Sequence, residues 1–256
     1  MMSHPDPLTV TIADGIARVT FDRPEVMNAF DAAQRQRFKA ALLALESDAA
    51  VRVIVLTGRG RAFCAGQDQN ESAAMDAAGS AARIDDYMDL YDVFRGLTKP
   101  VIASLNGVAA GAGLQIALMS DLRIGCEHAR LGMTELNVGS AAIVGSALLL
   151  PIIGEAAMKR LVLLAEILSA DQALSMGLLH EVVPHAELET RVTVVAQKLA
   201  QWSPISVAIT KSWWKTMSDE AFDKSAQAAR HGHALNFASG AYTEGAQRFK
   251  ARKLGS

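Results

Sequence analysis

Two neighbouring segments near the start of the chain alternate between apolar and polar residues. The first covers residues 8–12 and the second residues 17–22, and the dipeptide Asp14-Gly15 lies between them. Alternation with a period of two is typical of a strand with one buried face, and Asp-Gly is common in the tight turn of a hairpin. The pattern therefore predicts a β-hairpin at the start of the fold.

Three later segments, residues 51–58, 101–105 and 122–125, are short and apolar almost throughout. Such runs are typical of strands that are covered on both faces. Between them, apolar positions recur at helical spacing over residues 31–45 and 72–96. The recurrence of strand and helix patterns predicts an α/β fold.

The two helical segments carry finer expectations. In the first, we expect Asp31 to cap the N-terminus and Arg35, Arg37 and Lys39 to face solvent. In the second, Gly79 is a weak point of the helix.

From Glu155 onward the pattern is nearly all helical, apart from a short run at residues 178–183 that stops at Pro184. We therefore expect two parts, a core over residues 1–190 and a helical region over residues 191–256.

Two glycine-rich turns, residues 62–68 and 106–113, carry the main chemical signal. Each follows an apolar run and precedes a helical stretch. Small residues let the backbone turn tightly and leave its N–H groups open to a ligand, and two such groups aimed at one oxygen stabilise an oxyanion. One acidic residue, Glu135, follows the second turn. Oxyanion donors with a carboxylate indicate enolate chemistry on a carbonyl compound.

Composition narrows the class of protein. The chain has 256 residues, of which 50% are hydrophobic and 20% charged, and its net charge of -2 argues against nucleic acid as a partner. Its two cysteines form neither a disulfide framework nor a metal spacing, which favours a reducing cytoplasm. The N-terminus lacks the pattern of a signal peptide. The uncharged segment 136–154 is long enough for a membrane span, but Asn137 and Pro151 favour a buried loop and helix.

Other chemistries find weaker support. A dinucleotide fingerprint is incomplete, because Phe63 and Ile116 stand where its third glycine belongs. Cys64 has apolar neighbours, which favours a buried thiol over a nucleophile. His231 and His233 lie two apart in a helical stretch and point to different faces, so we expect no metal site.

Five segments together resemble one family. They are R-P-E-V-M-N-A at residues 23–29, the turn G-R-A-F-C-A-G-Q-D at residues 60–68, the stretch that begins K-P-V-I-A at residue 99 and runs through Asp121, and later landmarks at residues 177–183 and 244–252. In this order they resemble the crotonase superfamily, the enoyl-CoA hydratases and isomerases. The resemblance runs from about residue 8 to the C-terminus.

The resemblance implies a spiral of strand–strand–helix turns with a C-terminal helical region for trimerisation, and hence a homotrimer or a dimer of trimers. It also implies an acyl-CoA thioester as substrate, with coenzyme A present only as part of that substrate and no separate cofactor. The backbone N–H groups of Gln67 and Ala112 would form the oxyanion hole. Asp68 is expected to cap a helix or form a turn rather than to act in catalysis. The substrate-binding residues that it implies are Val26, Ala29, Ala65, Gln67, Asp68, Gly111, Ala112 and Lys250.

The chain departs from the family at one catalytic position. Hydratases of the family use two glutamates, and here the second is Glu135 while the first is replaced by Gln115. An amide can hold a water molecule but cannot take or deliver a proton at neutral pH. Glu135 is then the single acid/base, and apolar neighbours such as Leu131, Met133 and Leu136 would raise its pKa toward neutrality if they surround it.

One carboxylate suits the isomerisation of a 3-enoyl thioester to a 2-enoyl thioester and equally the hydration of a 2-enoyl-CoA, with Gln115 positioning the water. Two alternatives stay open. One is another enolate reaction, namely decarboxylation, retro-aldol cleavage or carbon–carbon hydrolysis, for which Tyr87 and Tyr91 are candidate side chains. The other is a non-catalytic acyl-CoA-binding protein.

Overall fold

The computed structural model describes residues 6–254, without the side chains of residues 246 and 249–254. Its larger sheet has six strands in the order β1-β2-β3-β5-β7-β10. The expected hairpin is present, because β1 and β2 pair antiparallel from Leu8 with Phe21 to Ala13 with Ile16. The other neighbours in this sheet pair in parallel. The strands are β1 (Leu8–Ala13), β2 (Ile16–Phe21), β3 (Val53–Gly58), β5 (Val101–Leu105), β7 (Leu122–Cys126) and β10 (Glu181–Val183).

A smaller sheet of four short strands lies beside the larger one, in the order β4-β6-β8-β9. After each of β3, β5 and β7 the chain adds one short strand to this second sheet. A helix then follows before the next turn begins, so the chain winds as a spiral of strand–strand–helix units. The strands are β4 (Ala62–Cys64), β6 (Val108–Ala110), β8 (Arg130–Gly132) and β9 (Ile167–Ser169).

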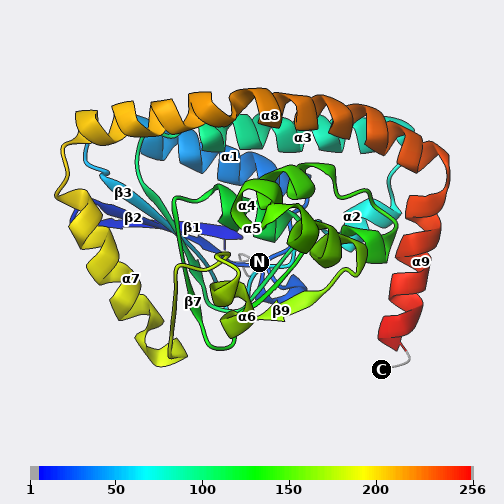
Figure 1. Cartoon of the computed structure of the whole chain (residues 1–256), viewed down its shortest axis with the longest axis horizontal. Coiled ribbons are helices and arrows are strands. Elements are labelled where there is room, and N and C mark those ends of the chain that lie inside the picture. Colours follow the sequence, from blue (N-terminus) through cyan, green and yellow to red (C-terminus); the bar gives the residue numbers. More distant parts are fainter. Residues whose placement is uncertain (1–5, 255–256) are drawn as a thin grey trace, which may run out of the picture.

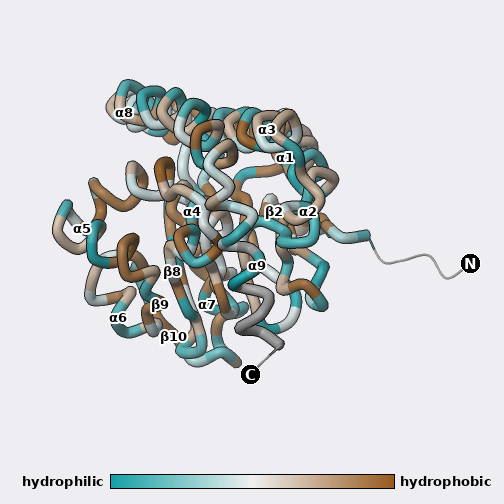
Figure 2. The backbone as a smooth tube through the Cα atoms, turned by 90° about the vertical axis from the view of Figure 1, so that its right-hand side faces the viewer, coloured by the Kyte–Doolittle hydropathy of each residue, from teal (hydrophilic) through white to brown (hydrophobic). Residues whose placement is uncertain are grey.

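Helices cover both faces of the larger sheet. On one face α1 (Ala32–Ser47), α3 (Ala77–Arg95) and the long α8 (Pro204–Ala238) lie together across the top of the molecule (Figure 1). On the other face α7 (His185–Ala200) packs its buried side chains, including Val192, against the strands. Figure 2 shows the same layering from the side, with α3 and α8 adjacent. The remaining elements are η1 (Pro24–Val26), α2 (Gln69–Ala73), α4 (Ala112–Met119), η2 (Glu135–Val138), α5 (Ile143–Leu163), α6 (Ala170–Ser175) and α9 (Ala241–Leu254).

Three local expectations are decided by the structure. Asp31 caps α1 by accepting a hydrogen bond from the backbone N–H of Gln34. The expected single helix over residues 72–96 is wrong, because Asp76 begins a new helix whose first turn contains Gly79. Segment 136–154 forms η2 and much of α5, which is interrupted at Gly154, where φ is 74°.

None of the helices between residues 6 and 254 combines the length and apolar composition that crossing a bilayer requires. The division into a core over residues 1–190 and a helical region over residues 191–256 stays a prediction.

The two glycine turns touch each other through their backbones. A Cβ atom on Gly113, in the first turn of α4, would lie 2.1 Å from the carbonyl oxygen of Cys64. A Cβ atom on Gly66, whose φ is +91°, would lie 2.6 Å from the carbonyl oxygen of Ala110 and 3.2 Å from the nitrogen of Ala112. Such separations leave no room for a side chain. Glycine at these two positions therefore lets α4 approach β4 closely.

The substitution Gly113→Ala should therefore separate α4 from β4 and lower the free energy of unfolding by about 3 kcal/mol, since the rigid backbone of Cys64 must move. Gly154→Ala is the control for a methyl group without a clash: its φ of 74° adds backbone strain that Gly113 does not have, but no atom lies within 4 Å of the added methyl group. The control should cost about 1–2 kcal/mol, all of it from that strain. Urea unfolding of both variants measures the difference, and equal losses would contradict this account of the contact.

Candidate active site

A cavity of about 560 Å³ opens between the two glycine turns, α3, η2 and the start of α9. It brings together residues from elements that lie far apart in the sequence. Every residue expected at the site lines this cavity except Lys250, whose side chain lies outside the described part of the chain. The expected residues that line it are Val26, Ala29, Ala65, Gln67, Asp68, Gly111, Ala112, Gln115 and Glu135.

The backbone N–H groups of Gln67 and Ala112 are both available as donors. Phe30 bonds to the residues on both sides of Gln67. Its N–H donates to the carbonyl oxygen of Gly66 at 2.7 Å, and its own carbonyl oxygen accepts from the N–H of Asp68 at 2.9 Å. Ala112 is the first residue of α4, where backbone N–H groups have no partner within the helix. Neither N–H donates a hydrogen bond to any described residue. The partial positive charge of the helix N-terminus adds to their pull on an oxyanion.

Glu135 is placed beside this turn as the first residue of η2. Its Oε1 atom lies 3.7 Å from where a Cβ of Gly111 would stand, so its carboxyl group is adjacent to the backbone just before Ala112. Oε1 accepts a hydrogen bond from Gln115, whereas Oε2 is buried and has no partner among the described residues. Burial raises the pKa of Glu135 from 4.5 to about 7.

Three apolar residues were expected around this carboxyl group. Leu131 and Met133 are fully buried and Leu136 is 41% exposed, but none of the three lines the cavity. The side chain that contacts the carboxyl group directly is that of Gln115, whose Nε2 atom donates to Glu135 Oε1 at 2.8 Å.

Tyr91 fixes the orientation of Gln115. Its hydroxyl group donates to Gln115 Oε1 at 2.9 Å, so the amide nitrogen must face Glu135. Burial raises the pKa of Tyr91 well above its usual value, so the hydroxyl group stays protonated and remains a donor. The chain Tyr91–Gln115–Glu135 holds the carboxylate in one position without offering a second proton-transfer group at neutral pH.

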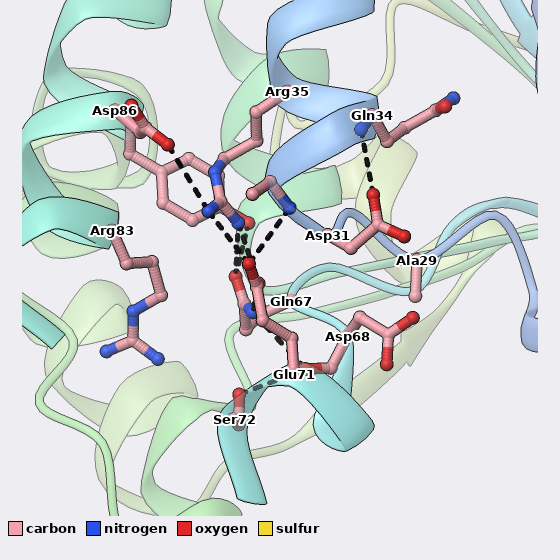
Figure 3. Close-up of polar contacts among 12 residues, drawn as sticks. Ala29, Asp31, Gln34, Arg35, Gln67, Asp68, Glu71, Ser72, Arg83 and Asp86 are labelled. Carbon is pink, nitrogen blue, oxygen red and sulfur yellow. Dashed lines mark hydrogen bonds and ion pairs between the residues drawn. The ribbon is translucent and has the colours of Figure 1, made fainter. Parts of the chain in front are cut away.

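The side chain of Gln67 belongs to a separate polar network (Figure 3). Its Oε1 atom accepts from the Tyr87 hydroxyl group at 2.9 Å and from Arg35 Nη1 at 3.2 Å, and its amide nitrogen donates to Glu71. Burial favours a higher pKa for Glu71, but hydrogen bonds from Arg35 and Gln67 outweigh it and lower that pKa. The carboxylate therefore stays charged and holds the turn that carries the Gln67 N–H.

The expectation that Arg35 faces solvent is wrong. Its side chain is only 2% exposed, and it pairs with Glu71 at 3.0 Å and with Asp86 at 3.5 Å. Helical spacing placed this position at the border of the apolar face, and its two acidic partners lie on α2 and α3. No signal in the sequence near Arg35 could have identified them.

The segment that begins at Arg23 shapes the outer part of the cavity. Asn28 is buried, accepts from the N–H of Arg23 and donates to the carbonyl groups of Arg59 and Ala62. Asp68 caps α2 as expected, through the N–H of Asn70, and also pairs with Arg23 at 3.1 Å. These bonds connect the segment to the first glycine turn. Contact of Val26, Ala29 and Ala65 with coenzyme A stays a prediction.

Nucleophilic and metal chemistry find no further support in the described residues. Burial raises the pKa of Cys64 to about 12, so its thiol is not ionised near neutral pH. Between residues 6 and 254 no group of three His, Cys, Asp or Glu side chains is placed to hold a metal ion.

The family model for enoyl-CoA hydratase/isomerase matches residues 11–254. The chain belongs to this family. An (E)-benzylidenesuccinyl-CoA hydratase of Thauera aromatica is 35% identical over 207 residues, 80% of each protein. A 1,2-epoxyphenylacetyl-CoA isomerase of Escherichia coli K12 is 32% identical over 249 residues, 94% of each.

Solved structures agree with this assignment. The crystal structure of an enoyl-CoA hydratase from Mycobacterium avium subsp. paratuberculosis K-10 is 28% identical, covers 96% of each chain and has a TM-score of 0.86. The fold is thus the crotonase-like spiral, and the protein is an enzyme of the enoyl-CoA hydratase/isomerase type. An acyl-CoA thioester is consistent with these relatives as its substrate.

The raised pKa of Glu135 has a consequence for stability. The folded protein keeps this proton up to about pH 7, whereas the unfolded chain loses it near pH 4.5, so the free energy of unfolding falls as pH rises between these values. Glu135→Gln removes the ionisable group, so the free energy of unfolding of the variant does not fall with pH for this reason. The variant should match the wild type at pH 4.5 and exceed it at pH 8 by roughly 1–3 kcal/mol.

Urea unfolding at the two pH values measures this effect. Glu127→Gln, the same change at an exposed position, is the control and should leave the free energy of unfolding within about 0.5 kcal/mol of the wild type at both pH values. An equal difference between Glu135→Gln and the wild type at both pH values would mean that the Glu135 pKa is not raised in the folded protein.

Proposed function

We propose that this enzyme isomerises a 3-enoyl-CoA to a 2-enoyl-CoA, with Glu135 as its single acid/base. The observation that carries the proposal is the pair formed by Glu135 and Gln115. One carboxyl group with a pKa of about 7 lies beside the two available N–H groups, and an amide occupies the facing position. A group with that pKa can take a proton and return it with comparable ease near neutral pH.

In the proposed reaction the thioester oxygen accepts hydrogen bonds from the N–H groups of Gln67 and Ala112. The Glu135 carboxylate removes a proton from C2 of the 3-enoyl chain, and the electron pair moves into a dienolate whose negative charge lies on that oxygen. The protonated Glu135 then delivers the same proton to C4, which leaves a double bond between C2 and C3. Oε2 accepts no hydrogen bond from the described residues, so it is not committed to another group, and Glu135 lines the cavity.

Hydration of a 2-enoyl-CoA is the second candidate, and one observation favours it. The Gln115 amide nitrogen has two N–H groups, of which one donates to Glu135, so the other can hold a water molecule beside the carboxylate. In that reaction Glu135 takes a proton from the water as its oxygen adds to C3, and then returns a proton to C2. The Thauera aromatica relative is named as a hydratase.

The finer expectations about the substrate and the assembly belong to this proposal. Val26, Ala29, Ala65 and Lys250 would contact coenzyme A, which enters only as part of the substrate. The helical region over residues 191–256 would form a homotrimer or a dimer of trimers. The exposed apolar side chains of Ile205, Ile209 and Trp213 on α8 support burial between subunits. A reducing cytoplasm suits the two buried free cysteines.

The absorbance of the conjugated thioester separates the candidate reactions. With a 3-enoyl-CoA the band should appear, and Glu135→Gln should slow its appearance at least about 100-fold, because Gln cannot transfer the proton. Glu127→Gln should behave as the wild type. Loss of the band from a 2-enoyl-CoA would instead show hydration. No change with either substrate would contradict both candidates and favour another enolate reaction or a binding protein.

The pH dependence of kcat/KM tests the single-carboxylate mechanism. The wild type should rise in activity to a plateau above about pH 7, because the free enzyme needs Glu135 deprotonated. Gln115→Glu should place two carboxyl groups within hydrogen-bonding distance, so that they share one proton and the rise moves to higher pH by about 1 unit or more.

The same variant should hydrate a 2-enoyl-CoA at least about 10-fold faster than the wild type, because it supplies a second proton-transfer group. Gln172→Glu is the control, since Gln172 caps α6 and glutamate preserves that role. An unchanged pH profile in Gln115→Glu would mean that position 115 does not face the proton-transferring group.

A further inference from the structure

Arg83 is a buried cation that lines the cavity and has no acidic partner among the described residues. It lines the cavity from α3 and is only 5% exposed. Its Nη1 atom donates to the Tyr242 hydroxyl group at 2.7 Å, and its guanidinium carbon lies 4.9 Å from the centre of that ring. In the described part of the chain it forms no ion pair. Figure 3 shows its guanidinium group directed away from Glu71 and Asp86.

The acidic residues nearest to Arg83 on α3 have other partners. Asp85 pairs with Arg230 at 2.8 Å, and Asp86 pairs with Arg35 at 3.5 Å. A guanidinium group has five N–H donors, and Tyr242 takes one of them. No nitrogen of Arg83 is both fully buried and without a hydrogen-bond partner. The remaining donors therefore keep some accessible surface, and Arg83 lines the cavity.

The position of Arg83 along α3 places it away from the reacting carbons. Tyr91, which orients Gln115 and through it Glu135, is eight residues further along the helix, a rise of about 12 Å. Between them the wall of the cavity on α3 is formed by Ile84, Tyr87 and Met88. The cavity thus extends from the site of proton transfer, which Tyr91 adjoins through Gln115, to a cation about two helical turns away along α3, past a largely apolar wall.

The other side chains near Arg83 do not neutralise it. His233 and Tyr242 line the cavity with it. Burial and the charge of Arg83 lower the pKa of His233 to about 4, so this imidazole is neutral near pH 7. A buried charge is costly unless an opposite charge accompanies it. The charge of Arg83 is therefore best balanced by an anionic group that enters with the ligand.

We propose that the acyl chain of the substrate ends in a carboxylate and that Arg83 binds it. The inference rests on the proposed acyl-CoA site and adds the substrate class, an unsaturated acyl-CoA derived from a dicarboxylic acid. The planar guanidinium group matches a carboxylate with two parallel hydrogen bonds, and Tyr242 holds it in place. The apolar wall on α3 accommodates the methylene groups between the thioester and the carboxylate.

Adipyl-CoA and hexanoyl-CoA test this proposal by calorimetric titration, because they differ only in the terminal carboxylate. Both are saturated and undergo no turnover, so the result does not depend on which reaction the enzyme performs. The wild type should bind adipyl-CoA at least about 10-fold more tightly than hexanoyl-CoA. Arg83→Gln should abolish this preference and leave the Kd for hexanoyl-CoA within about 3-fold of the wild type, which also shows that the variant is folded.

Two further variants sharpen the comparison. Arg230→Gln removes an arginine on α8 that pairs with Asp85 outside the cavity, and it should keep the full preference for adipyl-CoA. Arg83→Lys retains the charge but not the two-pronged geometry, and it should keep part of the preference.

Equal affinity of the wild type for the two thioesters would overturn this inference and leave the proposed reaction intact. An equal loss of adipyl-CoA, hexanoyl-CoA and free coenzyme A in Arg83→Gln would also overturn it, since Arg83 would then contact a phosphate of the coenzyme. Failure of the wild type to bind any of the three would overturn the acyl-CoA site itself, and with it the proposed function.

Discussion

The close approach of the two glycine turns is the contact on which the site depends. Gly113 lies against the carbonyl group of Cys64, and Gly66 lies against the backbone of Ala110 and Ala112. Mainly backbone atoms fill this contact, together with Cβ of Cys64, so the N–H groups of Gln67 and Ala112 can point into the same cavity. The spiral makes this contact possible, because each of its turns adds one strand to the smaller sheet. The strands β4 and β6, which precede the two contacts, are therefore neighbours in that sheet.

Electrostatics divide the cavity into regions with different tasks. At Glu135, deep burial outweighs the hydrogen bonds from its own backbone N–H and from Gln115, and it raises the pKa to about 7. Glu71 is less deeply buried, and direct hydrogen bonds from Arg35 and Gln67 lower its pKa. The two carboxyl groups thus differ both in their burial and in the groups that face them. One is set for proton transfer, and the other is a permanent charge that holds the first glycine turn in place.

Much of the fold follows from patterns that are local in the chain. The hairpin over β1 and β2, the buried strands and the cap at Asp31 were predictable because the residues that determine them are close neighbours. The split between α2 and α3 was missed, because the helical spacing lies within residues 84–94 and says nothing about the break near Asp76. Arg35 was misjudged for a related reason, since its partners lie on other helices.

The sequence alone determined the family, the two glycine turns and the presence of a single carboxylate where hydratases of the family use two. These depend on residue identity and spacing. The tertiary structure decided what each group can do. It placed Gln115 against Glu135, set the pKa of that carboxyl group through burial, and left Arg83 in the cavity with no acidic partner in the described part of the chain. Burial and charge pairing depend on which distant segments meet, and spacing along a single chain does not specify that.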